Sequence, residues 1–335
     1  MKNMKRFDRI PQFLVLFIVL LFGNEIRTVA AQESTPKLFA PGVISGPADD
    51  LSPAFEPPIG GLVYFTRSNG ANSMILVSAF ADERWIKPGI APFSGRWNDM
   101  EPAISPDGSI LVFASNRPVD SSGKVLDGSY NGKKIAGGGG NLWLVRRIMR
   151  GSSSWWSEPE RLPASINQDE NTFSPSIARD HSIYFMRADR TTGNFHLFRS
   201  QFQAGTYLEP LRLPIGDAST EDVDPAVAPD ESFLIYSSNH PLEKQPKRLH
   251  IVFRQGARWA SPQDLGDEVN GKGSNIEARL SPDGKTLYFS TNTVPPSDVP
   301  RSQQLAKRDI SEMLSWANGR HNIWYVDVQK LRLSQ

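Results

Sequence analysis

The sequence predicts an all-β fold, a single β-propeller of five blades, and three observations lead to this prediction. First, a tight turn followed by an apolar strand occurs at residues 105–116 and again, nearly unchanged, at residues 281–292. Second, a more divergent copy lies at residues 228–239. Third, four of the repeating units end in an aromatic-x-x-Pro pattern. A turn-and-strand unit copied at intervals of about 50 residues is typical of propeller blades.

Residues 1–31 have the pattern of a signal peptide rather than of a folded element. A basic start is followed by an unbroken apolar run at residues 13–22. Val29 and Ala31 are small residues at the two positions that a signal peptidase reads, so we expect cleavage before Gln32. The apolar run is shorter than the roughly 20 residues that span a bilayer, and an N-terminal membrane anchor is the alternative. We therefore expect a periplasmic or secreted protein.

Charge and cysteine content limit the partners of residues 32–335, which we expect to form the propeller. The whole chain has 37 basic and 36 acidic residues, so no charge excess indicates nucleic acid or an anionic membrane as a partner. The chain has no cysteine, which excludes disulfides and thiolate metal ligands. No stretch after the signal peptide is apolar enough to cross a membrane. We expect a monomer that binds an envelope protein or an oligosaccharide.

Each unit is predicted to contain four short strands. The first strand begins at a proline, or at Ala in the last unit, and these strands are residues 53–55, 102–104, 175–177, 225–227 and 278–280. A turn follows, in which Pro fixes φ, Asp bonds the backbone two residues on and Gly accepts a positive φ. The second strands are apolar runs that suit strands covered on both faces. They are residues 62–65, 110–113, 183–185, 233–236 and 287–289.

The third and fourth strands complete each unit. The third strands are predicted at residues 74–77, 142–145, 195–198, 249–253 and 323–328. The fourth strands carry the aromatic-x-x-Pro pattern, at residues 85–88, 156–159, 207–210 and 259–262. Proline suits an outer edge strand, because one side of that strand has no partner to lose.

The fifth unit has no fourth strand, because the sequence ends soon after Val328. A spare β-prone segment, residues 36–39, precedes the first unit. We expect this segment to supply the missing outer strand and to close the ring, since closure leaves only short edges. Five units and this strand give five blades. A sixth, degenerate blade is the alternative, for which little sequence is left.

Two insertions interrupt the period, at residues 118–141 and 293–321, and each joins a second strand to a third strand. The first ends in four consecutive glycines and predicts a flexible loop, since no Lys-Ser or Lys-Thr follows as in a phosphate loop. In the second, Ile310, Met313 and Leu314 recur at helical spacing and predict one short amphipathic helix. We expect this apolar face to pack on the ring, with a partner-docking helix as the alternative.

The Ser-Pro-Asp-Gly turns at residues 105–108 and 281–284 resemble WD40-like propeller repeats of the Pro-Asp type. Such repeats occur in the periplasmic protein TolB and in many exported bacterial proteins, and the resemblance covers residues 36–328. It implies a TolB-like propeller fold. It does not imply one function, because propellers serve as scaffolds, binding proteins and enzymes alike.

Polar side chains are predicted to gather at one mouth of the central channel, on the same face as both insertions. One set lies three positions before the first-strand proline or its equivalent, and a second set follows the second strands. The first set is Asp50, Asp99, Asp222 and Asn275, and the second is Arg117, Arg187, His240 and Asn292. Ligands commonly bind where loops gather over a rigid scaffold. These side chains predict a ligand site, with a divalent cation as the only candidate cofactor. The alternative is that they cap turns and bond backbone amides.

The sequence favours an exported, non-catalytic propeller that binds a protein or a glycan through its loop-rich face. The alternative function is a carbohydrate-active enzyme, either a glycoside hydrolase or a lyase. Such an enzyme needs two carboxylates about 5–10 Å apart, and the candidates are Asp99, Asp222 and Glu277. Because the acids occupy repeat-equivalent positions, which favours a structural role, we expect a binding protein rather than an enzyme.

Overall fold

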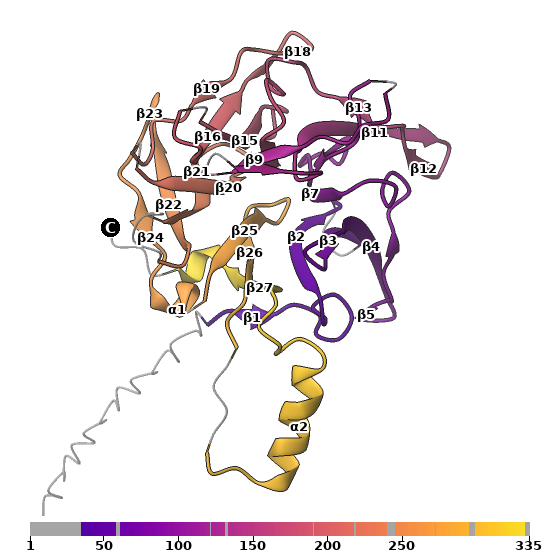
Figure 1. The fold of residues 1–335 in the computed structure, drawn as a ribbon, viewed down its shortest axis with the longest axis vertical. Coiled ribbons are helices and arrows are strands. Elements are labelled where there is room, and N and C mark those ends of the chain that lie inside the picture. The colour runs from indigo at the N-terminus through magenta and orange to yellow at the C-terminus, as the bar shows by residue number, and fades with distance from the viewer. Residues whose placement is uncertain are drawn as a thin grey trace, which may run out of the picture. The chain divides into compact units, whose positions relative to one another are not determined.

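The strands of the computed structural model pair into five antiparallel sheets of four or five strands. In Figure 1 these sheets follow one another round a common centre, in chain order from indigo to yellow. This arrangement is the five-bladed propeller that the repeat predicts, so the prediction is confirmed. The structure describes residues 35–57, 61–120, 122–130, 133–189, 191–217, 219–239, 245–271, 273–294 and 299–331. The predicted signal peptide lies outside these residues.

Each blade begins with its innermost strand and proceeds outward. The innermost strands are β2 (Asp49–Phe55), β7 (Asp99–Ile104), β14 (Thr172–Ile177), β20 (Glu221–Val227) and β25 (Asn275–Leu280). The second strands are β3 (Leu62–Ser68), β8 (Ile110–Ser115), β15 (Ile183–Ala188), β21 (Phe233–Asn239) and β26 (Thr286–Thr291). The third strands are β4 (Ser73–Ala81), β11 (Asn141–Arg150), β16 (Phe195–Ser200), β22 (Arg248–Gln255) and β27 (Asn322–Asp327). The predicted strands are confirmed, and each is longer at one end or both, except that β27 begins one residue before and ends one residue before the predicted 323–328.

The outer strand of blades 1 to 4 is broken into two short pieces. The first pieces are β5 (Arg84–Trp85), β12 (Ser153–Trp156), β18 (Thr206–Tyr207), which pairs with β17 (Phe202–Gln203), and β23 (Arg258–Trp259). The second pieces are β6 (Gly89–Ile90), β13 (Glu160–Arg161), β19 (Leu211–Arg212) and β24 (Gln263–Asp264). In each blade the aromatic residue ends the first piece and the proline directly precedes the second. The predicted fourth strand is therefore a bend, placed where Pro has no N–H to donate.

The N-terminal segment closes the ring, as predicted. Strand β1 (Lys37–Leu38) pairs with β27 as the outer strand of blade 5. The next residue, Phe39, packs its ring edge-on against Phe55, Trp85 and Tyr288, with centroids 5.5, 5.6 and 5.5 Å away. Because Phe55 and Trp85 belong to blade 1 and Tyr288 to blade 5, Phe39 joins the first and last blades.

Every innermost strand contains a β-bulge at the equivalent position, where its register with the second strand shifts. One residue of each bulge has a positive φ of 50–57°: Ser52, Glu101, Ser174, Asp224 and Glu277. Proline follows four of these residues but Ala278 follows the fifth, so proline alone does not cause the bulge. Bulges re-aim side chains, and in this ring they bring five side chains from five blades into contact.

The first insertion contains a two-stranded hairpin, β9 (Gly128–Tyr130) and β10 (Lys133–Ile135), where the sequence predicts only a loop. Gly140 follows this hairpin and lies against Phe173 of blade 3. A Cβ at Gly140 would lie 2.1 Å from that phenyl ring, so this position accepts no side chain without a shift of the ring.

The second insertion contains the predicted helix, α2 (Gln303–Met313). The prediction that its apolar face packs on the ring is wrong, because Ile310, Met313 and Leu314 are 59%, 49% and 76% exposed. The residue that α2 buries is Asp309. The described residues also contain two helical turns that were not predicted, α1 (Asp267–Asn270) and a 3-10 turn (Val328–Lys330). Among the described residues, no helix has the length and apolar character needed to span a bilayer.

Candidate functional site

The five bulge side chains meet at the centre of the ring and are buried there. Ser52 Oγ donates to Glu277 Oε2 at 2.5 Å, and the Glu277 N–H donates to Asp224 at 2.9 Å. Ser174 donates twice, from its Oγ to Asp224 at 3.0 Å and from its N–H to Glu101 at 2.6 Å. One chain of hydrogen bonds therefore links all five blades through their innermost strands.

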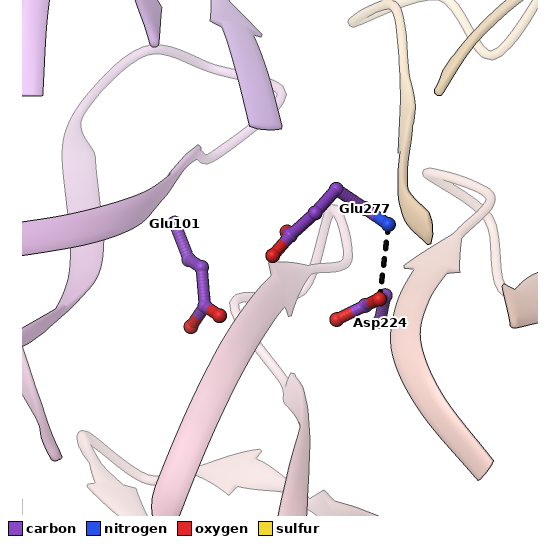
Figure 2. A group of neighbouring side chains, drawn as sticks. All are labelled: Glu101, Asp224 and Glu277. Atoms are coloured by element: carbon purple, nitrogen blue, oxygen red, sulfur yellow. Dashed lines mark hydrogen bonds between the residues drawn. The ribbon is translucent and has the colours of Figure 1, made fainter. Parts of the chain in front are cut away.

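Three of these five residues are acids from three different blades. One carboxylate oxygen of each of Glu101, Asp224 and Glu277 lies within 4.8 Å of the other two. Figure 2 shows the three side chains gathered round one space, with the bond from the Glu277 N–H to Asp224 dashed. Arg279 is the neighbouring base: its Nη2 lies 3.4 Å from Glu277 Oε2, and its Nη1 donates to the Ala278 carbonyl at 2.7 Å. Three acids beside one guanidinium leave an excess of negative charge.

Burial is the main cause of altered acidity in this cluster. It raises the pKa of Glu101 to about 7, with repulsion from Asp224 adding to the effect and the Ser174 N–H opposing it. Burial also raises the pKa of Glu277 well above its usual value, and the negative charges of Asp224 and Glu101 raise it further, while Arg279 lowers it. Near neutral pH Glu101 and Glu277 therefore hold a proton more readily than an exposed glutamate does.

The cluster has two chemical capacities. A carboxyl that keeps its proton donates a hydrogen bond and an ionised neighbour accepts one, so the pair matches a ligand hydroxyl, which does both. The carboxylates are also hard oxygen ligands of the kind that Ca²⁺ and Mg²⁺ take, although the Arg279 guanidinium already supplies positive charge. The sequence predicts no cofactor and leaves a divalent cation at this mouth as a candidate, which the structure does not test.

A cavity of 520 Å³ has Glu101 and Glu277 in its lining. Its walls come from the β3–β4 loop and from the first insertion, both of which join second strands to third strands, so it opens on the loop-rich face. The other lining side chains with apolar or hydrogen-bonding groups are Leu51, Thr66, Ser68, Ala71, Asn72, Ser73, Asn98, Met100, Ile135, Ala136 and Phe173. Among the residues that the structure describes, no Lys, Arg or His lines it. The cavity combines apolar walls with two buried carboxyls.

Asp50 and Asp99, two of the residues predicted to bind ligand, are buried at the starts of β2 and β7. Asp50 accepts from Arg67 Nε at 2.6 Å, and Asp99 accepts from Arg117 Nη2 at 2.7 Å. Burial nevertheless outweighs the attraction of Arg67 and raises the pKa of Asp50 to about 6. Each pair ties the start of an innermost strand to the end of its second strand. A role of Asp50, Asp99 and Arg117 in ligand binding stays a prediction.

Asp222 occupies the same position in blade 4 and is also buried. It accepts from Ser238 Oγ at 2.7 Å, and its Oδ2 lies 3.9 Å from Nδ1 of the buried His196. Arg187 of blade 3 lies over the ring of Phe198, with Cζ 4.2 Å from the centroid. Asp222 and Arg187 thus both contact other side chains of the propeller, and their part in ligand binding stays a prediction.

The two predicted asparagines bond the loop that enters blade 5. Asn275 Nδ2 donates to the Gly273 carbonyl at 3.0 Å, and Asn292 Oδ1 accepts from the Ser274 N–H at 2.9 Å. His240 lies outside the described residues. Among the described residues predicted to bind ligand, none lines the 520 Å³ cavity.

Glu277 is the one member of the predicted catalytic set that reaches the cavity, where Glu101 accompanies it in place of Asp99 and Asp222. The position of each acid relative to the proline is the sequence signal for this cluster. The three acids at the centre stand one position before the first-strand proline or its equivalent. The residues predicted to surround the channel stand three positions before it. The bulge decides between these positions, because its positive φ turns the nearer side chain toward the centre.

Solved propellers with different functions are similar to this chain. The α-L-arabinofuranosidase of Lactobacillus brevis is 14% identical with a TM-score of 0.50, and the match covers 86% of this chain and 92% of the enzyme. TolB from Acinetobacter baumannii is 13% identical with a TM-score of 0.45, and the match covers 85% of this chain and 56% of TolB. The putative TolB from Agrobacterium tumefaciens is 13% identical with a TM-score of 0.48, over 86% of this chain and 80% of that one.

At these identities the likeness shows the propeller fold and no function. The propeller fold predicted from the repeat is confirmed by the sheet topology and by the likeness to the arabinofuranosidase. The chain spans little more than half of the TolB from Acinetobacter baumannii. No protein-family model matches the chain, and no curated protein matches its sequence.

Proposed function

We propose that this protein is an exported, non-catalytic propeller that binds a neutral oligosaccharide in the 520 Å³ cavity of its loop-rich face. The observation that carries the proposal is the lining of that cavity, in which Glu101 and Glu277 lie beside apolar walls. Small-ligand pockets usually measure about 300–1,000 Å³. This cavity is therefore large enough for a sugar at the end of an oligosaccharide chain.

The lining favours a sugar over other small ligands. Phe173 and Met100 offer apolar surface to the C–H faces of a sugar ring. Thr66 and Asn72, with the two carboxyls, offer groups that bond hydroxyls. A phosphate or a uronate would meet no Lys, Arg or His among the described lining residues and would be repelled by the carboxylates. The ligand should therefore be neutral.

A thermal-unfolding screen of residues 32–335 tests this function. Neutral oligosaccharides should raise the melting temperature and acidic ones should not. Ala71 lines the cavity on the exposed β3–β4 loop, so Ala71→Trp should fill the cavity and abolish the rise without disturbing the core. Ala81→Trp is the matched control, since Ala81 is also exposed but lies at the far end of β4. Equal shifts in both variants would contradict the proposal.

Export to the periplasm or the exterior is part of the proposal, and it rests on the signal-peptide pattern of residues 1–31. The mature protein recovered from its native host should begin at Gln32. N-terminal sequencing of that material checks this expectation. A chain that keeps residues 1–31 would indicate the membrane-anchor alternative instead.

Glycoside hydrolysis is a second candidate, because Glu101 and Glu277 are buried carboxyls with raised pKa values in a cavity. One oxygen of each lies within 4.8 Å of the other, which is compatible with the roughly 5–5.5 Å between the carboxyl groups of retaining glycosidases. Both carboxyls also accept hydrogen bonds that link the blades, which favours a structural and binding role. If the protein is an enzyme, Glu277→Gln should abolish release of nitrophenol from aryl glycosides. If it only binds, neither wild type nor variant should release any.

A further inference from the structure

Helix α2 presents its apolar side chains to solvent. Ile310, Met313 and Leu314 are 59%, 49% and 76% exposed, and Val299, just before the helix, is 81% exposed. Ile310, Met313 and Leu314 lie three and four residues apart, so they form one stripe on the helix. Four large apolar side chains are thus exposed within one short insertion, and exposed apolar surface of this kind marks interaction sites.

Residues 299–321 contain four bases, Arg301, Lys307, Arg308 and Arg320, and two acids, Asp309 and Glu312. Asp309 is buried and forms an ion pair with Arg301, in which Asp309 Oδ2 lies 3.0 Å from Arg301 Nη1. Lys307 is exposed, and the Arg308 side chain, 3.8 Å from Glu312, is 64% exposed. The described residues of the insertion therefore carry a net positive charge, although the whole chain is nearly neutral.

The insertion is held at its base and projects at its tip. Asn318 Nδ2 donates to the Pro47 carbonyl at 3.1 Å, and Arg320 Nη1 lies 2.9 Å from Asp49 Oδ2, so the end of the insertion is tied to blade 1. In Figure 1, α2 stands away from the five sheets, below β1 and β27. A projecting, convex element can reach a flat surface that the ring itself does not touch.

We propose that α2 docks on an anionic lipid surface, with Ile310, Met313, Leu314 and Val299 inserted among the acyl chains. Interfacial helices bind lipid in this way, with apolar side chains buried and Lys or Arg side chains at the headgroups. A protein partner fits the patch less well, because a specific interface buries about 800 Å² on each side. A single helix of 11 residues supplies less than that.

Vesicle flotation of residues 32–335 tests the proposal, with neutral phosphatidylcholine vesicles and with vesicles that also contain phosphatidylglycerol. Wild type should float with the anionic vesicles and should be released by salt. The double variant Ile310→Asn and Leu314→Asn should bind them at least about tenfold less tightly. The matched control, Met149→Asn and Leu211→Asn, changes residues that are 62% and 72% exposed on other blades and should bind like wild type.

Lys307→Glu separates the charge contribution from the apolar one. It should weaken flotation with anionic vesicles and leave the melting temperature unchanged, because Lys307 is exposed. The proposal is overturned if wild type fails to float, or if the two double variants lose binding equally. It is also overturned if sedimentation shows a dimer, without lipid, that Leu314→Asn dissociates, since the stripe would then bind a second copy.

Discussion

A rise in pH from about 5 to about 8 should lower the free energy of unfolding, because a buried carboxyl at the ring centre is forced to ionise. Burial raises the pKa of Glu101 to about 7 in the folded chain, against a usual value of 4.5. Between these values the folded state holds a proton that the unfolded state has released. The stabilising contribution of the protonated carboxyl is complete below pH 4.5 and is lost as the pH rises through 7.

The size of the effect follows from the two pKa values. Their difference corresponds to about 3 kcal/mol, or about 6 °C in melting temperature for a large domain. Asp50, with its pKa raised to about 6, and Glu277 add to the loss in the same direction. Glu101→Gln keeps the shape and an oxygen that accepts the Ser174 N–H, but it carries no charge. The variant should therefore lose about 3 kcal/mol of the pH dependence.

Urea unfolding of wild type and Glu101→Gln at several pH values between about 5 and 8 measures this difference directly. Glu160→Gln is the control, because the Glu160 side chain is 61% exposed. Its replacement should leave the change of unfolding free energy with pH as in wild type. Parallel curves of stability against pH for wild type and Glu101→Gln would refute the reasoning. They would mean that Glu101 is ionised throughout this range.

Three stability predictions follow from packing and charge, each measured by thermal or urea unfolding. Gly140→Ala should cost about 1–3 kcal/mol because its Cβ meets a phenyl ring of the next blade, whereas Gly89→Ala, with open space around it, should cost less than about 1 kcal/mol. Phe39→Ala should cost about 3–5 kcal/mol, and no loss would contradict its role in closing the ring. Asp99→Asn should cost about 3–5 kcal/mol because Arg117 keeps a buried, unpaired charge; an unchanged stability would count against this ion pair.

The blades could be predicted from the sequence because their signals are local. The Ser-Pro-Asp-Gly turns specify φ residue by residue, and the apolar run that becomes β8 reads as a covered strand without any knowledge of its neighbours. The closing strand could also be predicted, since residues 36–39 and a blade without an outer strand require each other. These features depend only on short sequence segments and on the number of strands in each repeating unit.

The centre of the ring could not be predicted in the same way. Asp99 and Glu101 are two residues apart on one strand, and regular alternation would place both on the same face. The bulge gives Glu101 a positive φ and separates them, so that Glu101 reaches the cavity while Asp99 pairs with Arg117. No local signal states that a bulge is present, since it persists where Ala278 replaces the proline.

Helix α2 shows a second limit of sequence patterns. The spacing of Ile310, Met313 and Leu314 predicts a helix and an apolar stripe, and both are present. Which face turns inward depends on tertiary contacts, and the ion pair of Asp309 with Arg301 lies on the inner side. Burial of an apolar stripe is therefore a property of the whole fold and not of the helical period.

The most direct test of the account is a calorimetric titration of neutral oligosaccharides into residues 32–335, run in parallel on wild type and Ala71→Trp. The account predicts that wild type binds at least one of them and that Ala71→Trp binds none. At 100 times its dissociation constant the ligand should then add about 2.7 kcal/mol to the stability of wild type. Equal binding by both proteins, or binding of acidic oligosaccharides alone, would contradict a neutral-sugar site in the cavity over Glu101 and Glu277.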